Sequence, residues 1–273
     1  MRPLDQQTIL VTGATDGHGR GLARELARRG ATVLIHGRNQ GRIDATVADI
    51  AEETGGNRPA GYLADLGSLA AVRRLADDVS TRGGLDALVN NAGIAPRVRT
   101  VSADGYELTF AVNYLAPFLL TYLLLPALRK RPHARIVNVA SGAQAPVNFG
   151  DVMLEHGYSW EFAYAQSKFA LIAFTFELAR RLQARSETRV TANALHPATL
   201  MPTKLVFESY GRTLDSLEKG VGATLWLVTD RKLDRVSGTF FNGRTEARAA
   251  RGTYDGDTRR RLWDLSERLC GLR

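Results

Sequence analysis

The chain has 273 residues, of which 44% are hydrophobic and 23% charged, with a formal net charge of +8 at pH 7. That length can bury roughly three quarters of the unfolded surface in one domain, and the single cysteine, Cys270, excludes an intrachain disulfide. No apolar run reaches the roughly 18 residues that a membrane span needs, and the N-terminus lacks a signal-peptide pattern, so we expect a cytoplasmic protein without a membrane partner.

Apolar, β-branched runs alternate with helical patterns along the chain. Helices are predicted between the strands, for example over 19–30 and 68–83, where apolar residues recur at spacings i, i+3 and i+4. Strands that are apolar throughout indicate a parallel sheet covered on both faces. The sequence therefore predicts an α/β protein, a single doubly wound Rossmann domain over residues 1–273 with a parallel seven-stranded sheet. The predicted strands are 8–13, 31–37, 60–65, 85–91, 134–141, 190–197 and 237–243.

A glycine-rich turn follows the first predicted strand directly. Glycines stand at 13, 17 and 19, in the spacing G-x-x-x-G-x-G rather than the general G-x-G-x-x-G. Glycine permits positive φ and a close approach of the backbone to a ligand. The helix that follows offers free N–H groups and a positive dipole end, which suit a phosphate. Glycines at this spacing also occur where a strand and a helix merely pack tightly, and the place after the first strand favours the phosphate.

Further motifs follow in order, and together they resemble the short-chain dehydrogenase/reductase family. The chain is most similar to the retinol-dehydrogenase-like and related bacterial members, and the likeness covers nearly its whole length. Three positions depart from the family pattern: His18 replaces an aliphatic residue, Ala198 replaces a glycine, and Ala140 precedes the retained Ser141. The motifs are T-G-x-x-x-G-x-G at 12–19, N-N-A-G at 90–93, Asn113, Ser141 and Y-x-x-x-K at 164–168.

The resemblance implies a cofactor site and a catalytic set. It implies that Ser141 hydrogen-bonds the substrate oxygen, that Lys168 also holds the nicotinamide ribose, and that Asn113 positions a water linking Lys168 to solvent. The catalytic residues are then Asn113, Ser141, Tyr164 and Lys168. The implied cofactor-binding residues are Gly13, Thr15, Asp16, Gly17, His18, Gly19, Arg38, Asp65, Leu66, Asn91, Ala92, Gly93, Tyr164, Lys168, Pro197, Thr199 and Thr203.

Tyr164 and Lys168 stand four residues apart in an otherwise apolar helical run, so their side chains lie one above the other. A free tyrosine has a pKa near 10, and lowering it by about three units takes about 4 kcal/mol. A neighbouring ammonium and an oxidised nicotinamide favour the phenolate in this way. Tyr164 can then donate a proton to a carbonyl oxygen as the carbon accepts hydride. By itself, such a pair is also compatible with a buried tyrosine and an extended lysine on an ordinary helix.

The second predicted strand ends in His36, Gly37 and Arg38. NAD binding favours an acidic residue here, on the ribose 2′-hydroxyl. Arg38 instead suits a 2′-phosphate, which it can bind through two charged hydrogen bonds, although an arginine here can also be an ordinary solvated loop residue. The sequence therefore predicts NADP(H). The five histidines have no metal-ligand spacing, so no metal is expected, and the scattered basic pairs, without a binding motif, predict no nucleic-acid partner.

The sequence thus predicts an NADP(H)-dependent oxidoreductase that interconverts a ketone or aldehyde and an alcohol, and the resemblance implies a homo-oligomer, dimer or tetramer. Two alternatives stay open: a tailoring reductase or epimerase of specialised metabolites, and a catalytically silent NADP(H)-binding redox sensor. Two segments with apolar and aromatic side chains, 142–162 and 198–220, predict a bulky, mainly apolar substrate. We expect the second segment, which includes Leu200, Met201, Leu205 and Phe207, to be a mobile lid.

Overall fold

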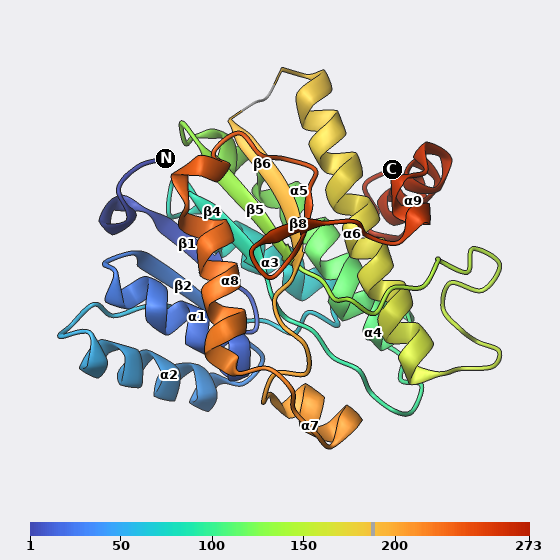
Figure 1. The fold of residues 1–273 in the computed structure, drawn as a ribbon, viewed down its shortest axis with the longest axis horizontal. Helices are drawn as coiled ribbons and strands as arrows, with labels where there is room; N and C mark the ends of the chain where they lie inside the picture. Colours follow the sequence, from blue (N-terminus) through green and yellow to red (C-terminus); the bar gives the residue numbers. More distant parts are fainter. Residues whose placement is uncertain (187–188) are drawn as a thin grey trace.

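The computed structural model describes residues 1–186 and 189–273. One sheet lies between two layers of helices (Figure 1), with strand order β3-β2-β1-β4-β5-β6-β7-β8. The first seven strands run parallel, as predicted, and a short eighth strand adds antiparallel to β7 because the chain reverses at Gly243, where φ is +60°. The strands are β1 (Thr8–Val11), β2 (Thr32–Gly37), β3 (Ala60–Leu63), β4 (Ala87–Asn90), β5 (Ala134–Val139), β6 (Val190–His196), β7 (Phe240–Asn242) and β8 (Thr245–Ala247).

Helices cover both faces of the sheet. Helices α1, α2 and α8 share one apolar cluster with one face, and α3, α5 and α6 share another with the opposite face, where α9 packs beside α6. A doubly wound arrangement follows from this layering. The α-helices are α1 (Gly17–Arg28), α2 (Gln40–Glu53), α3 (Leu69–Ser80), α4 (Leu108–Phe110), α5 (Ala116–Arg129), α6 (Trp160–Ala184), α7 (Lys204–Tyr210), α8 (Leu217–Thr229) and α9 (Gly256–Leu269).

Short 3-10 helices and one wide turn complete the elements: η1 (Leu4–Gln6), η2 (Ala111–Leu115), η3 (Arg231–Leu233) and η4 (Arg251–Tyr254). The element η2 is a π-helical turn between α4 and α5. Such turns insert one extra residue into a helix and are frequent at functional sites. Here the turn holds Asn113 with its side chain fully buried.

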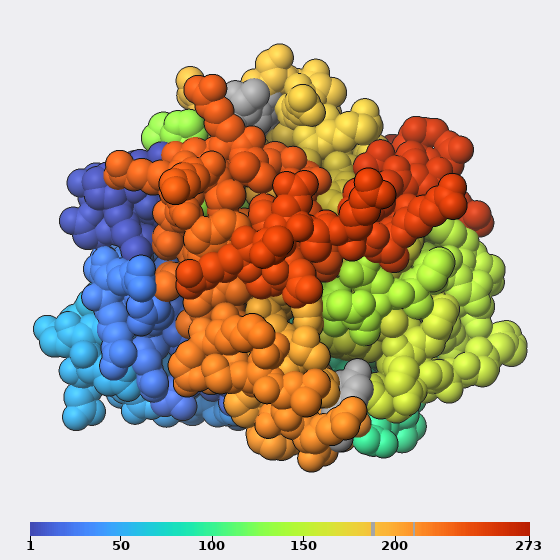
Figure 2. Space-filling model, in the orientation of Figure 1, coloured from blue at the N-terminus to red at the C-terminus, as the bar shows by residue number. Residues whose placement is uncertain are grey.

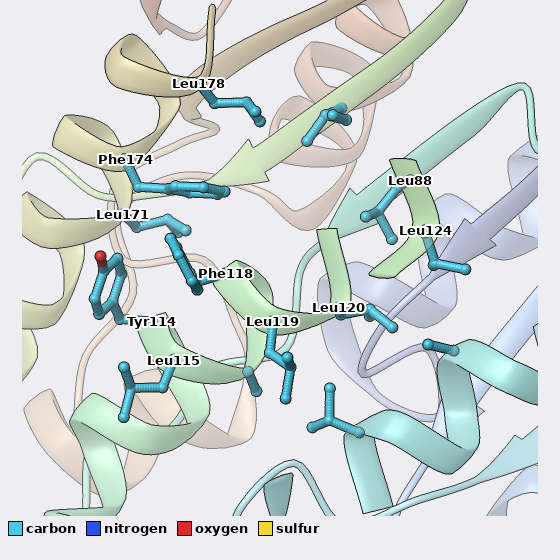
Figure 3. Packing of buried hydrophobic residues seen from close by; sticks show 14 of the residues in the cluster. Leu88, Tyr114, Leu115, Phe118, Leu119, Leu120, Leu124, Leu171, Phe174 and Leu178 are labelled. Atoms are coloured by element: carbon cyan, nitrogen blue, oxygen red, sulfur yellow. The ribbon is translucent and has the colours of Figure 1, made fainter. Parts of the chain in front are cut away.

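The α4–η2–α5 stretch corrects one sequence-based expectation. Residues Leu108–Arg129 form a helical stretch of 22 residues that is long and apolar enough to cross a membrane, contrary to the expectation that no apolar run is so long. Most of it is buried inside the protein. Figure 3 shows Tyr114 and Phe118 of this stretch packed beside Phe174 of α6, with the Phe118 and Phe174 ring centroids 5.2 Å apart. It is therefore a core helix.

The sheet reverses its winding direction between β1 and β4. From β1 the order proceeds through β2 to β3 on one side, and from β4 through β5 to β8 on the other. Two loops therefore leave the carboxyl ends of adjacent strands in opposite directions and leave a crevice between them, where open α/β sheets bind ligands. The glycine turn follows β1, and Asn91–Gly93 follow β4, so both lie at this crevice.

The predicted strands extend too far at the ends that bear motifs. The first strand ends at Val11 and not at residue 13, the fourth at Asn90 and not at 91, and the fifth at Val139 and not at 141. In each case the extra residues include one that was predicted to bind or react, namely Gly13, Asn91 or Ser141. The N–H groups of Thr12 and Ala140 still donate to the carbonyl oxygens of Val89 and Leu195 on the neighbouring strands, so the chain leaves the sheet only after them.

Candidate active site

The glycine turn has the backbone that its sequence predicts. Gly13 and Gly17 have φ of +63° and +46°, values that other residues rarely adopt. Gly19 is needed for a different reason: a Cβ there would lie 2.3 Å from the Gly13 carbonyl oxygen and 2.4 Å from Asn91 Nδ2. The absent side chain therefore lets α1 pack directly on the two loops of the crevice.

The N-terminus of α1 can receive a phosphate. Asp16 caps the helix through one oxygen, which accepts from the Gly17 N–H at 2.8 Å. The N–H groups of His18 and Gly19, in the first turn, have no acceptor within the helix. The other Asp16 oxygen pairs with Arg42 at 2.7 Å, so the cap carries a neutralising cation. These donors fit the pyrophosphate of a dinucleotide.

His36 is a further residue of the site, absent from the predicted set, and it holds this turn in place. Its Nδ1 accepts from the Gly13 N–H at 3.1 Å, and its Nε2 donates to the Ala64 carbonyl oxygen at 3.0 Å. Burial lowers the pKa of His36 to about 4, against the hydrogen bond to Ala64 and the charge of Asp65, which raise it. The ring is therefore neutral at pH 7, as accepting from Gly13 requires. A histidine inside an apolar strand was the only signal in the sequence.

This buried neutral histidine predicts acid sensitivity. The folded protein binds the His36 proton more weakly than the unfolded chain, whose histidine pKa is 6.5, so protonation favours unfolding. The stabilisation of the folded state by neutral His36 is fully present above pH 6.5 and is lost as the pH falls toward 4. We expect the free energy of unfolding to fall between pH 7 and pH 4 by about 3 kcal/mol more in the wild type than in His36→Gln. Urea titrations at both pH values measure this difference, and equal falls would show that the folded protein readily protonates His36.

Hydrogen bonds join the loop after β4 to the glycine turn. The Thr12 hydroxyl oxygen accepts from the N–H groups of Asn91 at 2.9 Å and Ala92 at 3.1 Å. The Asn91 amide donates to the carbonyl oxygens of Thr12 and Gly13 at 2.8 and 3.2 Å. The side-chain oxygen of Asn91 accepts a hydrogen bond from His18 Nδ1 at 2.7 Å.

The His18 side chain lies inside the protein. Its Nε2 contacts the Thr224 hydroxyl of α8 at 3.0 Å, and burial lowers the pKa of His18. Only the backbone of His18 can therefore serve as the predicted cofactor ligand. The imidazole replaces the usual aliphatic side chain with polar contacts that tie α1 to Asn91 and α8.

The Asn113 side chain bridges two elements at the crevice. Its oxygen accepts from the Ile94 N–H at 2.8 Å, and its amide donates to the Ile94 carbonyl oxygen at 2.9 Å and to the Ser167 hydroxyl at 3.0 Å. A Cβ on Gly93 would lie 3.6 Å from the Asn113 oxygen and 3.5 Å from Lys168 Nζ. Asn113, Gly93 and Lys168 are thus neighbours, although their sequence positions are far apart.

Lys168 connects Tyr164 with the end of β5. Its buried Nζ donates to the Val139 carbonyl oxygen at 2.8 Å and lies 5.6 Å from the centre of the Tyr164 ring. Burial lowers the pKa of Lys168 to about 8, so the ammonium stays largely charged at neutral pH. Ser141 follows Val139 by two residues, and its half-buried hydroxyl accepts from the Ala143 N–H at 3.1 Å. The structure therefore groups the end of β5 with the tyrosine and lysine of α6.

At the end of β2, Arg38 has an exposed side chain that makes no hydrogen bond or ion pair to the described residues. Asp65, after β3, is also exposed and accepts from the Gly67 N–H at 2.9 Å, whereas Leu66 is buried. Thr15 packs over Gly37, where a Cβ would lie 2.6 Å from the threonine methyl group. These residues border the side of the crevice where an adenosine would lie, and Arg38 presents an unpaired cation there.

The segment after β6 closes on itself and reaches the glycine turn. The Thr199 N–H donates to the Asp215 carboxylate at 2.7 Å, and the Asp215 N–H donates to the Thr199 carbonyl oxygen at 3.0 Å. A Cβ on Gly17 would lie 3.0 Å from the Thr203 methyl group. Because α8 begins at Leu217, the last residues of the predicted lid, 198–220, belong to that helix, and the stretch before it contains α7. We call residues 198–216 the lid segment.

Arg97 links the far end of the lid segment to α6. Its guanidinium donates to the carbonyl oxygens of Glu208 at 3.3 Å and Ser209 at 2.8 Å, at the end of α7. The same group lies 5.4 Å from the centre of a Trp160 ring, one helical turn before Tyr164. An arginine therefore does approach the predicted substrate region, although none is near Ser141 or Tyr164 in sequence.

The two predicted apolar walls are only partly formed as expected. The first segment ends at Ser159, where α6 begins, and not at 162. Phe149 and Met153 of that segment pack on the core, and Phe207 of the lid is 56% exposed. A hollow of about 500 Å³ lies beyond the end of β6, lined in part by Pro197, Thr199, Asp215 and Lys219. Figure 2 shows the lid segment, in orange, on the same face as the yellow-green residues before α6.

Comparison with known proteins agrees with this geometry. The model of the short chain dehydrogenase family matches residues 7–210. Retinol dehydrogenase 13 of Homo sapiens is 35% identical, with 97% of this chain and 85% of the relative aligned. Polyprenol dehydrogenase of Mus musculus is 37% identical, with 98% and 85% aligned.

Solved structures give the same picture. An uncharacterized protein from Mycobacterium paratuberculosis superposes with a TM-score of 0.81 at 33% identity, over 97% of this chain and 94% of that one. A short chain dehydrogenase from Escherichia coli CFT073, complexed with NADPH, superposes with a TM-score of 0.74 at 29% identity, over 89% and 98%. The protein described here therefore belongs to the short-chain dehydrogenase family, whose members are oxidoreductases that use nicotinamide cofactors.

Proposed function

We propose that the protein is an NADP(H)-dependent carbonyl reductase or alcohol dehydrogenase in which Tyr164 is the general acid and base. The observation that carries the proposal is the placement of Lys168. Its buried ammonium lies beside the Tyr164 ring and bonds the strand end that carries Ser141. A charged group with no ion-pair partner among the described residues is costly to bury, and this ammonium can favour the phenolate of Tyr164.

The cofactor would supply the hydride when bound. The N–H groups of His18 and Gly19 would hold its pyrophosphate, and Arg38 would hold its 2′-phosphate. Ser141 donates a hydrogen bond to the substrate oxygen and orients the carbonyl. Tyr164 transfers a proton to that oxygen during reduction and removes it during oxidation. One lone pair of the Asn113 oxygen remains for the water that returns protons from solvent.

We further propose a bulky, mainly apolar substrate. The support is the lid segment, which packs against Gly17 through Thr203 and is bonded by Arg97 at the end of α7, and so lies beside the glycine turn. The relatives include a retinol and a polyprenol dehydrogenase, which their names assign to long apolar alcohols. A screen of NADPH oxidation over ketones, aldehydes and quinones tests the proposal, and we expect kcat/KM to rise with apolar size. Best turnover with short polar carbonyls would exclude this substrate class.

The silent redox sensor remains the alternative outcome of the same screen. A sensor needs the glycine turn but not the set of Ser141, Tyr164 and Lys168. Tight NADPH binding with no turnover of any carbonyl compound would favour it. Equilibrium binding of NADPH, followed by fluorescence, separates this outcome from a protein that simply fails to bind cofactor.

Arg97 predicts a measurable effect on the lid segment. Arg97→Met keeps the aliphatic stem but removes both hydrogen bonds to the end of α7. With each bond contributing about 1 kcal/mol, the lid should open roughly 30-fold more often and KM for the carbonyl substrate should rise several-fold. Limited proteolysis within 198–216 and steady-state kinetics measure the two effects. Arg97→Lys is the matched control, because it keeps the charge and a group that can donate hydrogen bonds. Equal cleavage rates in all three proteins would show that Arg97 does not hold the lid.

A further inference from the structure

Apolar side chains that contact little of the protein project from the lid segment and from the loop that follows β4. Val98 is 76% exposed, Leu214 is 65% exposed and Phe207 is 56% exposed. Single exposed apolar residues are ordinary, but a group of them marks an interaction site. We call these three residues the lid rim.

Hydrogen bonds hold the two parts of the lid rim together. Arg97, the neighbour of Val98, bonds the carbonyl oxygens of Glu208 and Ser209, which directly follow Phe207. The Leu214 N–H donates to the Leu200 carbonyl oxygen at 3.1 Å, so this residue lies on the part of the lid segment that returns toward α8. Figure 1 shows α7 and the teal chain near residue 100 reaching the same lower edge of the molecule.

The chain segments that carry the lid rim have an excess of basic residues. Residues 96–101 and 203–214 contain Arg97, Arg99, Lys204 and Arg212 but one carboxylate, Glu208. That carboxylate lies 3.6 Å from Lys204 Nζ, and both side chains are exposed. Apolar side chains surrounded by a net excess of cations match an anionic lipid surface, which offers acyl chains beneath negative headgroups.

We propose that the lid rim docks the protein on an anionic lipid bilayer, with Val98, Phe207 and Leu214 entering the boundary between headgroups and acyl chains. This differs from the sequence-based expectation of no membrane partner, because burial of α4–η2–α5 excludes only a spanning role for that helix. If the proposed apolar substrate is correct, docking places the crevice where such molecules dissolve, and this last step rests on the proposed function.

A lipid surface fits the lid rim better than a second protein does. A stable protein interface buries about 800 Å² on each partner and involves about 20 to 30 residues a side. The lid rim has three projecting side chains on two loops, which is enough for shallow insertion into a bilayer but small for a protein interface. The neighbouring cations also suit a sheet of headgroups, because Lys and Arg near an anionic membrane attract it without fixed geometry.

Vesicle sedimentation tests the proposal with the full chain. We expect wild-type protein to sediment with vesicles of phosphatidylglycerol and phosphatidylcholine, and much less with phosphatidylcholine alone. Raising the salt should weaken binding, because exposed charges are screened. Val98→Ser combined with Leu214→Ser should lower the partition coefficient at least tenfold. Leu63→Ser is the matched control, since Leu63 is 58% exposed on β3, and it should bind like wild type.

Each other result would overturn the proposal. Absence of wild-type binding to anionic vesicles at low salt would exclude docking, and equal loss in Leu63→Ser would remove the role of the lid rim. A dimeric wild type whose Val98→Ser/Leu214→Ser variant is monomeric, by light scattering, would make the rim an interface between copies. Thermal unfolding and NADPH binding verify that the variants fold. Vesicle binding needs no turnover, so its failure and the failure of the proposed reaction are seen separately.

Discussion

Replacing Tyr164 with phenylalanine is expected to lower kcat at least about 100-fold, the effect typical of losing a general acid or base. The ring and its packing remain, and the Lys168 ammonium stays beside the ring, 5.6 Å from its centre in the wild type. What disappears is the hydroxyl that exchanges a proton with the substrate oxygen. Affinity for NADPH should survive, because the glycine turn and Arg38 are unchanged. Steady-state turnover and fluorescence titration measure the two quantities.

The matched control is Tyr122→Phe, since Tyr122 is an exposed tyrosine on α5, and its turnover should equal that of the wild type. Near-normal turnover of Tyr164→Phe on the preferred substrate would exclude the mechanism. A loss of NADPH binding together with turnover would instead assign the hydroxyl to holding the cofactor.

Replacing Arg38 with aspartate is expected to weaken NADPH binding on the order of 100-fold, because hydrogen bonds to charged groups contribute roughly 1.5–3 kcal/mol. The new carboxylate also repels the 2′-phosphate. NADH lacks that phosphate and can use an acidic group on its ribose hydroxyl, so its affinity should change little or improve. The preference between the two cofactors should therefore shift toward NADH, as measured by the ratio of their dissociation constants.

The matched control is Arg231→Asp, which makes the same change in net charge at an exposed residue of η3. It should leave the ratio of the two dissociation constants unchanged. Equal weakening of NADPH and NADH by Arg38→Asp would show that Arg38 does not read the phosphate. Since the Arg38 side chain bonds no described residue, loss of folding is not expected to confuse the result.

The sequence could predict those parts of the site that lie in local motifs. Gly13 and Gly17 are recognisable because positive φ demands glycine, and Tyr164 and Lys168 because a helix places residues i and i+4 together. The order of strands and helices predicts the crevice, since parallel strands bring their carboxyl ends to one edge. These features depend on neighbours in the chain or on the topology alone.

The sequence could not predict the contacts that join distant segments. His36 bonds Gly13 across 23 positions, and Arg97 bonds Ser209 across 112, and neither pair has a pattern of its own. β8 was missed because three residues at an exposed edge carry no apolar alternation. The sequence could not show that the Phe207 side chain faces outward, because a seven-residue helix can present either face to the protein until its ends are fixed.

The paired hydrogen bonds between Thr199 and Asp215 close the lid segment at its base, next to the sheet, and this closure has a consequence for evolution. The two ends of the intervening loop are already joined, so its length and composition can change without altering the geometry of the strands. Natural variation in residues 200–214 can therefore occur while the ends of β6 and α8 stay in place. We therefore expect that this loop can be exchanged between related proteins by laboratory recombination without loss of folding.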